Sequence, residues 1–160
     1  MSRFAPLVAL LILVSILSGC DRRAGEKRQI EETVRRYNQL LTQGYESLNM
    51  TPLTEVAETE QATKVYSHMA ALGEARTKMY PTLRDIAFSD FRFSSVSSAA
   101  VTTRESWDFR HVNIDSGTVT HEEKGFVYRL AYRLALRGGR WMVREVASME
   151  GNEKGSGAKR

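Results

Sequence analysis

The chain has 160 residues, with 23 lysines and arginines against 19 aspartates and glutamates, so its formal net charge is +4. Apolar residues make up 42% and charged residues 26% of it, a globular composition that argues against wholesale disorder. A single cysteine excludes a disulfide framework and a cysteine-based zinc cluster. The small positive surplus is weak support for nucleic-acid binding, so we expect one domain with its own core and no nucleic-acid partner.

The first twenty residues have the layout of a secretory signal peptide. Met1-Ser2-Arg3 gives a short positive start, and the apolar stretch 4–19 is 16 residues long, fewer than the roughly 20 of a membrane-spanning helix. Leu17-Ser18-Gly19-Cys20 then resembles the lipobox of bacterial lipoproteins in every position. The resemblance implies cleavage before Cys20 and acylation of its thiol, and two or more acyl chains anchor a protein stably. A plain signal peptide with a chance cysteine is the alternative.

The residue after the cysteine bears on localisation. Asp21 resembles the inner-membrane retention signal of enteric-type lipoproteins, although Arg22 is not its usual neighbour. We expect a cell-envelope protein that is lipid-anchored at the inner membrane and faces the periplasm or the outside. The chain then divides into a signal peptide (1–19), the lipidated cysteine with a short polar linker (20–25), one domain (26–149) and a disordered Gly/Lys-rich tail (150–160).

Helical periodicity dominates the first half of the predicted domain. Apolar residues recur every three or four positions from Glu26 to Leu48, which predicts one amphipathic helix. Thr51 and Pro52 favour a new helix start, and a second helical region, kinked or split near Glu60, runs to about Met79. We expect Tyr80-Pro81 to end it.

From about residue 84 the apolar period changes to two, which is typical of strands. Asn113–Gly117 predicts a turn, and Gly138-Gly139 predicts a tight hairpin. The predicted strands cover Phe88–Phe93, Val101–His111, Phe126–Leu136 and Trp141–Ala147. Helices followed by an antiparallel meander with one apolar face predict an α+β fold in which the helices pack on that face.

The end of the chain carries a family resemblance. Tyr128-Arg129-Leu130-Ala131-Tyr132 and Leu136-Arg137-Gly138-Gly139-Arg140-Trp141-Met142-Val143 resemble the last two strands of NTF2-like domains. They also look like the variant found in membrane-tethered bacterial proteins and in the intermembrane-space domain of plastid-division proteins. The resemblance implies a cone-shaped, curled sheet over 26–149, and sheets of this family often dimerise, so a homodimer is among the expected assemblies. A cystatin-like α+β fold, with one helix wrapped by a sheet, is the alternative.

Strand alternation assigns side chains to the two sheet faces. If the apolar residues face the helices, so do Glu105, Tyr128, Tyr132 and Glu145, which form a candidate pocket. NTF2-like enzymes often pair a carboxylate base with a tyrosine in the cone, which makes a small-ligand binder or a proton-transfer or hydrolytic enzyme the alternative function. No catalytic motif of the family matches, so we expect no catalytic residues and no enzyme.

Metal and cofactor signals are weak. His68, His111 and His121 lack ligand spacing, and the sequence contains no Walker loop, zinc-protease motif or nucleophile elbow. The three histidines are expected on the surface or at a rim. We expect no metal and no cofactor.

The opposite sheet face is rich in arginine, and we call its six predicted members the arginine face. They are Arg104, Arg110, Arg129, Arg133, Arg137 and Arg144. Such a patch suits an acidic protein, an anionic lipid surface or a cell-wall polymer, and it also suits a solvated face that discourages edge pairing. The leading hypothesis is a membrane-anchored envelope lipoprotein that acts as a non-catalytic binding or scaffold module for an envelope partner.

Overall fold

The computed structural model describes residues 5–149 and 153–154, and it describes side chains for residues 23–149. Three helical elements precede a five-stranded antiparallel sheet. The helices are α1 (Ala5–Ser47), the 3₁₀ turn η1 (Thr51–Glu55) and α2 (Thr59–Glu74). The strands are β1 (Thr77–Ser95), β2 (Ser98–Asn113), β3 (Val119–Arg137), β4 (Arg140–Ser148) and the short β5 (Glu153–Lys154).

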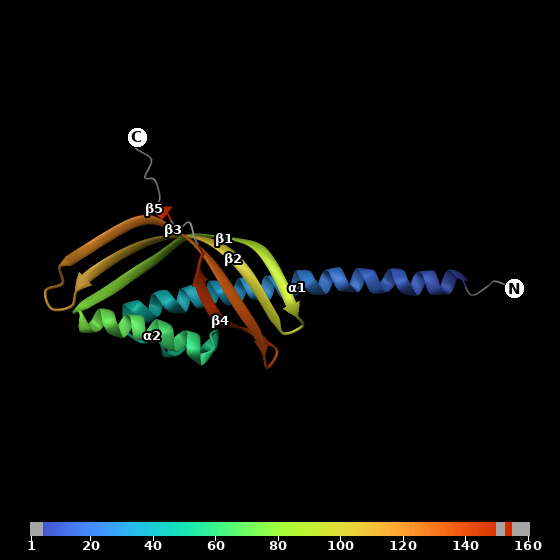
Figure 1. The fold of residues 1–160 in the computed structure, drawn as a ribbon, viewed down its shortest axis with the longest axis horizontal. Helices are drawn as coiled ribbons and strands as arrows, with labels where there is room; N and C mark the ends of the chain where they lie inside the picture. The colour runs from blue at the N-terminus through green and yellow to red at the C-terminus, as the bar shows by residue number, and fades with distance from the viewer. Residues whose placement is uncertain (1–4, 150–152, 155–160) are drawn as a thin grey trace, which may run out of the picture.

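Helix α1 is longer than the sequence predicts. The expected linker at 20–25 is helical, because Gly25 is its only helix breaker and extending an existing helix costs little. Its N-terminal part extends away from the sheet, as Figure 1 shows. The helix ends at Ser47, where Leu48 adopts a left-handed conformation and the Asn49 amide donates to the Gly44 carbonyl.

The predicted end of the second helical region is wrong. Helix α2 ends at Glu74, and Tyr80-Pro81 lies inside β1 instead of ending a helix. Proline is tolerated there because β1 is an edge strand, with only β2 beside it. Residues of β1 before Phe88 therefore belong to the sheet. The two predicted turns, Asn113–Gly117 and Gly138-Gly139, lie where the sequence predicts them, between β2 and β3 and between β3 and β4.

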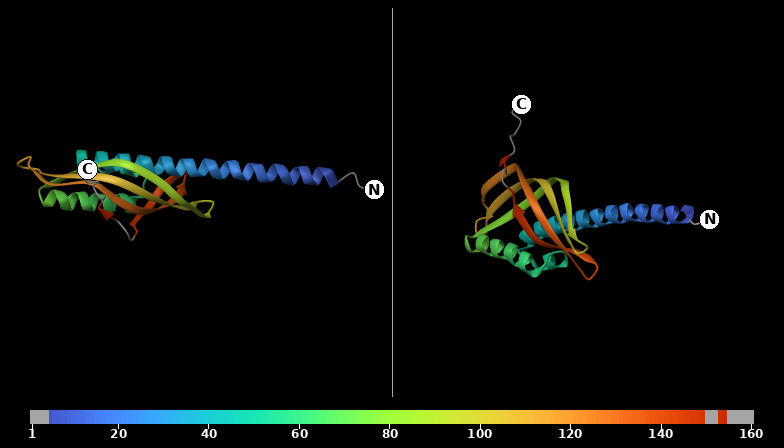
Figure 2. Two further views of the ribbon diagram at one scale, coloured as in Figure 1. Left: turned by 90° about the horizontal axis from the view of Figure 1, so that it is seen from above. Right: turned by 45° about the vertical axis from the view of Figure 1, so that its right-hand side comes forward.

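The sheet is curled and the helices lie in its concave side. Strand order is β1-β2-β3-β4, with β5 paired to β3. Helices α1 and α2 lie against the same face, and the long strands bend around them in all three views (Figures 1 and 2). The predicted α+β class, with helices packed on a curled antiparallel sheet, is confirmed.

The core lies between α1, η1 and the sheet. Ile30 and Val34 of α1, Leu53 of η1 and Val143 of β4 are all fully buried in one cluster. The segment after η1 also protects the open edge of β4, because the Val143 amide donates to the Val56 carbonyl and the Glu58 amide donates to the Val143 carbonyl.

Two of the irregularities in the sheet change which side chains of β3 and β4 face the helices. Between β2 and β3, Trp107 pairs with Phe126 but Phe109 pairs with Glu123, so Lys124 and Gly125 bulge out opposite Asp108. Gly125 adopts φ 65°, a conformation that favours glycine. In β4, Arg144 is the extra residue between the pairs Arg133–Glu145 and Leu134–Val143. Each bulge shifts the inward set of residues beyond it by one position.

The expected tail, 150–160, lies outside the described residues except for Glu153–Lys154. Those two residues form β5, so this part of the tail is a strand on the edge of β3.

We predict that Ile30→Ala lowers the free energy of unfolding by about 2–5 kcal/mol, because it removes a fully buried side chain from the contact between α1 and the sheet. Urea unfolding followed by circular dichroism measures it. Val96→Ala is the control, since Val96 is 73% exposed and its truncation should cost less than about 0.5 kcal/mol. Equal losses in the two variants would contradict the packing of α1 described here.

Candidate functional site

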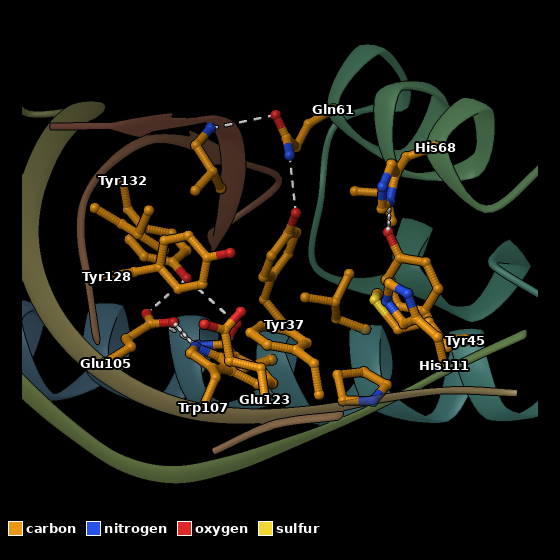
Figure 3. A pocket seen from close by; sticks show the side chains of 18 of the residues that line it. Tyr37, Tyr45, Gln61, His68, Glu105, Trp107, His111, Glu123, Tyr128 and Tyr132 are labelled. Atoms are coloured by element: carbon orange, nitrogen blue, oxygen red, sulfur yellow. Dashed lines mark hydrogen bonds between the residues drawn. The ribbon is translucent and has the colours of Figure 1, made fainter. Parts of the chain in front are cut away.

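A cavity of about 490 Å³ lies between α1, α2 and the sheet. Figure 3 shows Glu105 and Trp107 near one another and the pair Tyr45–His68 across the cavity from them. Its apolar lining includes Leu41 of α1, Val65 of α2, Phe109 of β2 and Leu130 of β3. A volume of this size falls in the range of about 300–1,000 Å³ that is typical of small-molecule sites.

Glu105 belongs to the polar part of the cavity wall, and its side chain is fully buried. The carboxylate oxygen Oε1 accepts hydrogen bonds from Thr103 Oγ1 at 2.8 Å, Tyr132 OH at 2.8 Å and Asn38 Nδ2 at 3.2 Å. The other oxygen, Oε2, accepts from Trp107 Nε1 at 2.9 Å. Helix α1 and strands β2 and β3 therefore meet at one carboxylate.

The four hydrogen-bond donors of Glu105 are uncharged, and two of them, the indole N–H of Trp107 and the amide NH₂ of Asn38, can only donate. The arrangement fits a carboxylate, whose two oxygens offer about four acceptor sites. Three of the four bonds go to Oε1 and one goes to Oε2. Glu105 is thus held as an acceptor by its neighbours on α1, β2 and β3.

The tyrosines beside Glu105 are poor proton donors. Burial, with the charge of Glu105 as the next cause, raises the pKa of Tyr132 well above its ordinary value. Burial also raises the pKa of Tyr37 to about 12. Both phenols therefore stay neutral across the physiological pH range, as members of a hydrogen-bond network.

A second network joins both helices to the sheet. Gln61 of α2 donates from Nε2 to the Tyr37 hydroxyl at 2.8 Å and accepts from the Val146 amide of β4 at 3.2 Å. Gln61 is buried, so this contact fixes α2 over the cavity and satisfies an edge amide of β4 at the same time. Figure 3 draws Gln61 reaching down to Tyr37 from α2.

The three histidines of the chain gather at the more exposed part of the lining, which we call the mouth. Tyr45 shares a hydrogen bond of 2.5 Å with His68 Nδ1, and the rings of His111 and His121 lie 5.4 Å apart. Burial, then the charges of His121 and His68, lowers the pKa of His111. Among residues 23–149, no three His, Cys, Asp or Glu side chains are arranged to hold a metal ion.

The structure brings three of the four predicted pocket residues together. Glu105, Tyr128 and Tyr132 line the cavity. The prediction for Glu145 is wrong, because the bulge at Arg144 turns it to the other face, where it pairs with Arg133 at 2.6 Å and Val146 lines the cavity instead.

Sequence reasoning missed two groups of lining residues. Asn38 on α1 gave no signal, because a buried amide looks like any polar residue in a helical pattern. Glu123 and His121 face the cavity because of the bulge at Gly125. Strict alternation counted back from Phe126 would turn both side chains to the outer face. A glycine inside a strand is the signal that identifies such a bulge.

The arginine face is largely paired. Arg133 binds Glu145, and Arg137 and Arg144 both approach Glu58. Arg110 lies over the ring of Tyr80, with its guanidinium carbon 4.9 Å from the ring centre. Arg104 and Arg129 are exposed and lie directly opposite each other on β2 and β3. The six side chains therefore do not form one continuous block of uncompensated charge.

Asp108 of β2 lies opposite the bulge in β3. It accepts from the Gly125 amide at 2.8 Å and from Arg84 of β1, and the Gly125 bond, followed by Arg84, lowers its pKa. It thereby fastens the bulge that directs Glu123 inward.

Comparison with known proteins gives a fold likeness without a family. No family model and no curated protein matches the chain. Two similar solved structures are the intermembrane space region of the chloroplast protein ARC6 (TM-score 0.64, 12% identity, 76% of this chain and 95% of that one) and a periplasmic fragment of TraM (TM-score 0.51, 14% identity, 76% and 98%). At these identities the likeness shows the fold alone, and the NTF2-like resemblance stays a prediction.

We predict that Glu105→Gln lowers the free energy of unfolding by about 1–3 kcal/mol, because an amide NH₂ would replace one acceptor and leave a buried donor without a partner. Urea unfolding at pH 7 measures the loss. Glu145→Gln is the matched control, since it removes an exposed ion pair worth less than about 1 kcal/mol. A Glu105→Gln protein as stable as Glu145→Gln would show that the network does not hold the sheet to α1.

Proposed function

We propose that the chain is a membrane-anchored cell-envelope lipoprotein whose domain is a non-catalytic binding module, with the cavity as its binding site. The observation that carries this proposal is a cavity of about 490 Å³ whose buried carboxylate is already occupied by four uncharged donors. The cavity offers volume and apolar surface, and its most buried ionisable group is engaged in holding the fold together.

The tether rests on the lipobox-like Leu17-Ser18-Gly19-Cys20 and on the position of α1. The N-terminal part of α1 lies away from the sheet (Figure 1). Among the α1 side chains that the structure describes, from residue 23 onward, the first fully buried one is Ile30. Cleavage before Cys20 therefore keeps the packed part of the helix. Within the described part of the chain, no helix is both long and apolar enough to cross a membrane. The fold likeness to an intermembrane-space region and a periplasmic fragment supports an envelope location.

The binding role is favoured over the enzyme alternative by geometry. A general base must lie within reach of the substrate proton, and Glu105 is fully buried with both oxygens already accepting hydrogen bonds from the protein. Tyr132 donates to Glu105 and is fully buried, so it does not present its hydroxyl to a substrate oxygen. The site suits recognition by shape and apolar contact.

A protein partner in the envelope is the second candidate for what the module binds. The arginine face is the surface for it, and Arg104 and Arg129 lie directly opposite each other within it. The glutamates that pair with Arg133, Arg137 and Arg144 reduce its net charge, so the cavity is the stronger candidate site.

We predict that the full chain, expressed in a lipoprotein-processing bacterium, incorporates an alkyne fatty acid and sediments with membranes, whereas Cys20→Ser does neither. The physical reason is that the acyl chains supply the anchoring free energy. Density-gradient fractionation of the wild-type membranes should place the protein with inner-membrane markers, as Asp21 suggests. A Cys20→Ser chain that is still labelled and still membrane-bound contradicts the tether, and co-sedimentation with outer-membrane markers contradicts the retention signal.

We predict saturable binding of the neutral fluorophore N-phenyl-1-naphthylamine to the lipoprotein in nanodiscs, read as energy transfer from tryptophan. Trp107 lines the cavity, so a guest there quenches it. Val65→Trp fills the cavity and should weaken binding at least tenfold, whereas Tyr66→Trp, one residue further along α2 and 56% exposed in the native chain, should leave it unchanged. Circular dichroism checks both folds, and Leu130→Phe replaces Val65→Trp if that variant does not fold. Absence of saturable binding, or equal binding in all variants, contradicts the proposed site.

A further inference from the structure

The apolar part of the cavity is built from flat rings. Trp107 and Phe109 stack with ring centres 6.0 Å apart, and the Tyr128 ring meets Phe109 edge-on at 6.1 Å. Met79 and Leu41 add flexible aliphatic surface beside these rings. Ring faces and edges arranged in this way complement another aromatic ring, which gains offset or edge-to-face contacts in addition to the burial of its surface.

The inner polar groups offer a guest almost nothing to bind. The donors around Glu105 are taken by its carboxylate, and Gln61 is taken by Tyr37 and Val146. A guest that places a charged or strongly polar group among them leaves it without partners, which costs free energy in a low-dielectric interior. Polar groups of a guest therefore belong at the mouth.

The permanent charges around the cavity have one sign. Its lining contains the carboxylates of Glu105 and Glu123 and no lysine or arginine. The histidines are the only lining groups that can become cationic, and the lowered pKa of His111 keeps that ring neutral at pH 7. An anion entering the cavity thus meets two carboxylates and no permanent cation. No attraction to a cation therefore offsets the free energy that its desolvation costs.

Glu123 is the charged group nearest to solvent in this lining. Its side chain is 22% exposed, and the bulge at Gly125 brings it onto the inner face opposite Phe109. Its charge is felt inside the cavity, because it contributes to the raised pKa of Tyr128. Glu123 therefore lies where an incoming molecule passes from water to the aromatic wall.

We infer that the cavity takes a small aromatic molecule that carries no negative charge, and that Glu123 at the mouth is the residue that excludes anions. This inference rests on the proposed binding function, because it assigns the class of ligand to the same site. The excluding charge is specific to the lining of this chain, because the bulge at Gly125 in β3 is what turns Glu123 inward.

The test compares two fluorophores that differ by one group. N-phenyl-1-naphthylamine is uncharged, and 8-anilino-1-naphthalenesulfonate has the same ring system with a sulfonate. Both are titrated into the nanodisc-held lipoprotein at pH 8, above the ordinary titration range of imidazole. We call the part of the binding that Val65→Trp removes the Val65-dependent component. In this component the neutral probe should bind at least tenfold more tightly than the sulfonate probe.

Glu123→Lys reverses the mouth charge and is the decisive variant. It should strengthen binding of the sulfonate probe at least fivefold more than it changes binding of the neutral probe. Lys124→Glu is the matched control, because Lys124 is the neighbouring residue, is 70% exposed and does not line the cavity. That control should change neither affinity.

The outcomes separate this inference from the proposed function. If the neutral probe binds in a Val65-dependent way but the sulfonate probe binds equally well in the wild type, the cavity is a binding site and the charge selection is wrong. If the probes differ but Glu123→Lys leaves the sulfonate affinity unchanged, Glu123 is not the excluding group. If neither probe shows a Val65-dependent component, the proposed function itself fails.

Discussion

The structure depends on a carboxylate buried without a cationic partner. Glu105 has no exposed surface, and it is compensated by hydrogen bonds from Asn38 on α1, Thr103 and Trp107 on β2, and Tyr132 on β3. Burying a charge is costly unless its acceptor sites are filled, so these four donors must be in place together. The network therefore specifies how α1 docks against the curled sheet.

That docking leaves space beside the network, and it determines the character of that space. The polar groups of the inner wall are satisfied by one another, while rings and aliphatic side chains from both helices and the sheet line the rest. A site of this kind recognises by shape, ring contacts and the sign of its charges, and its fully buried carboxylate is engaged in the network. Tethered at the start of α1, it would act as a receptor domain close to a membrane, which is the role we propose.

Periodicity predicted the fold class and most of the elements, because burial of one face imposes a period on the sequence. It also predicted that Glu105 and Tyr132 face the helices. It failed where the backbone departs from regular alternation: the bulge at Arg144 turned Glu145 outward, and the one at Gly125 turned Glu123 inward. The hydrogen bond between Asn38 and Glu105 could not be predicted either, because the periodicity of a helix does not show which carboxylate lies across the core.

The most direct measurement of the central claim is an NMR titration of the protein with N-phenyl-1-naphthylamine, following the indole Nε1–H of Trp107. We expect this proton to exchange slowly with water both before and after the probe binds, and the ring protons of Phe109 and Tyr128 to show contacts with the probe. Such a result means that the cavity fills while the Glu105 network stays intact. Rapid exchange of the indole proton in the free protein, or contacts confined to the outer face of the sheet, would contradict the account.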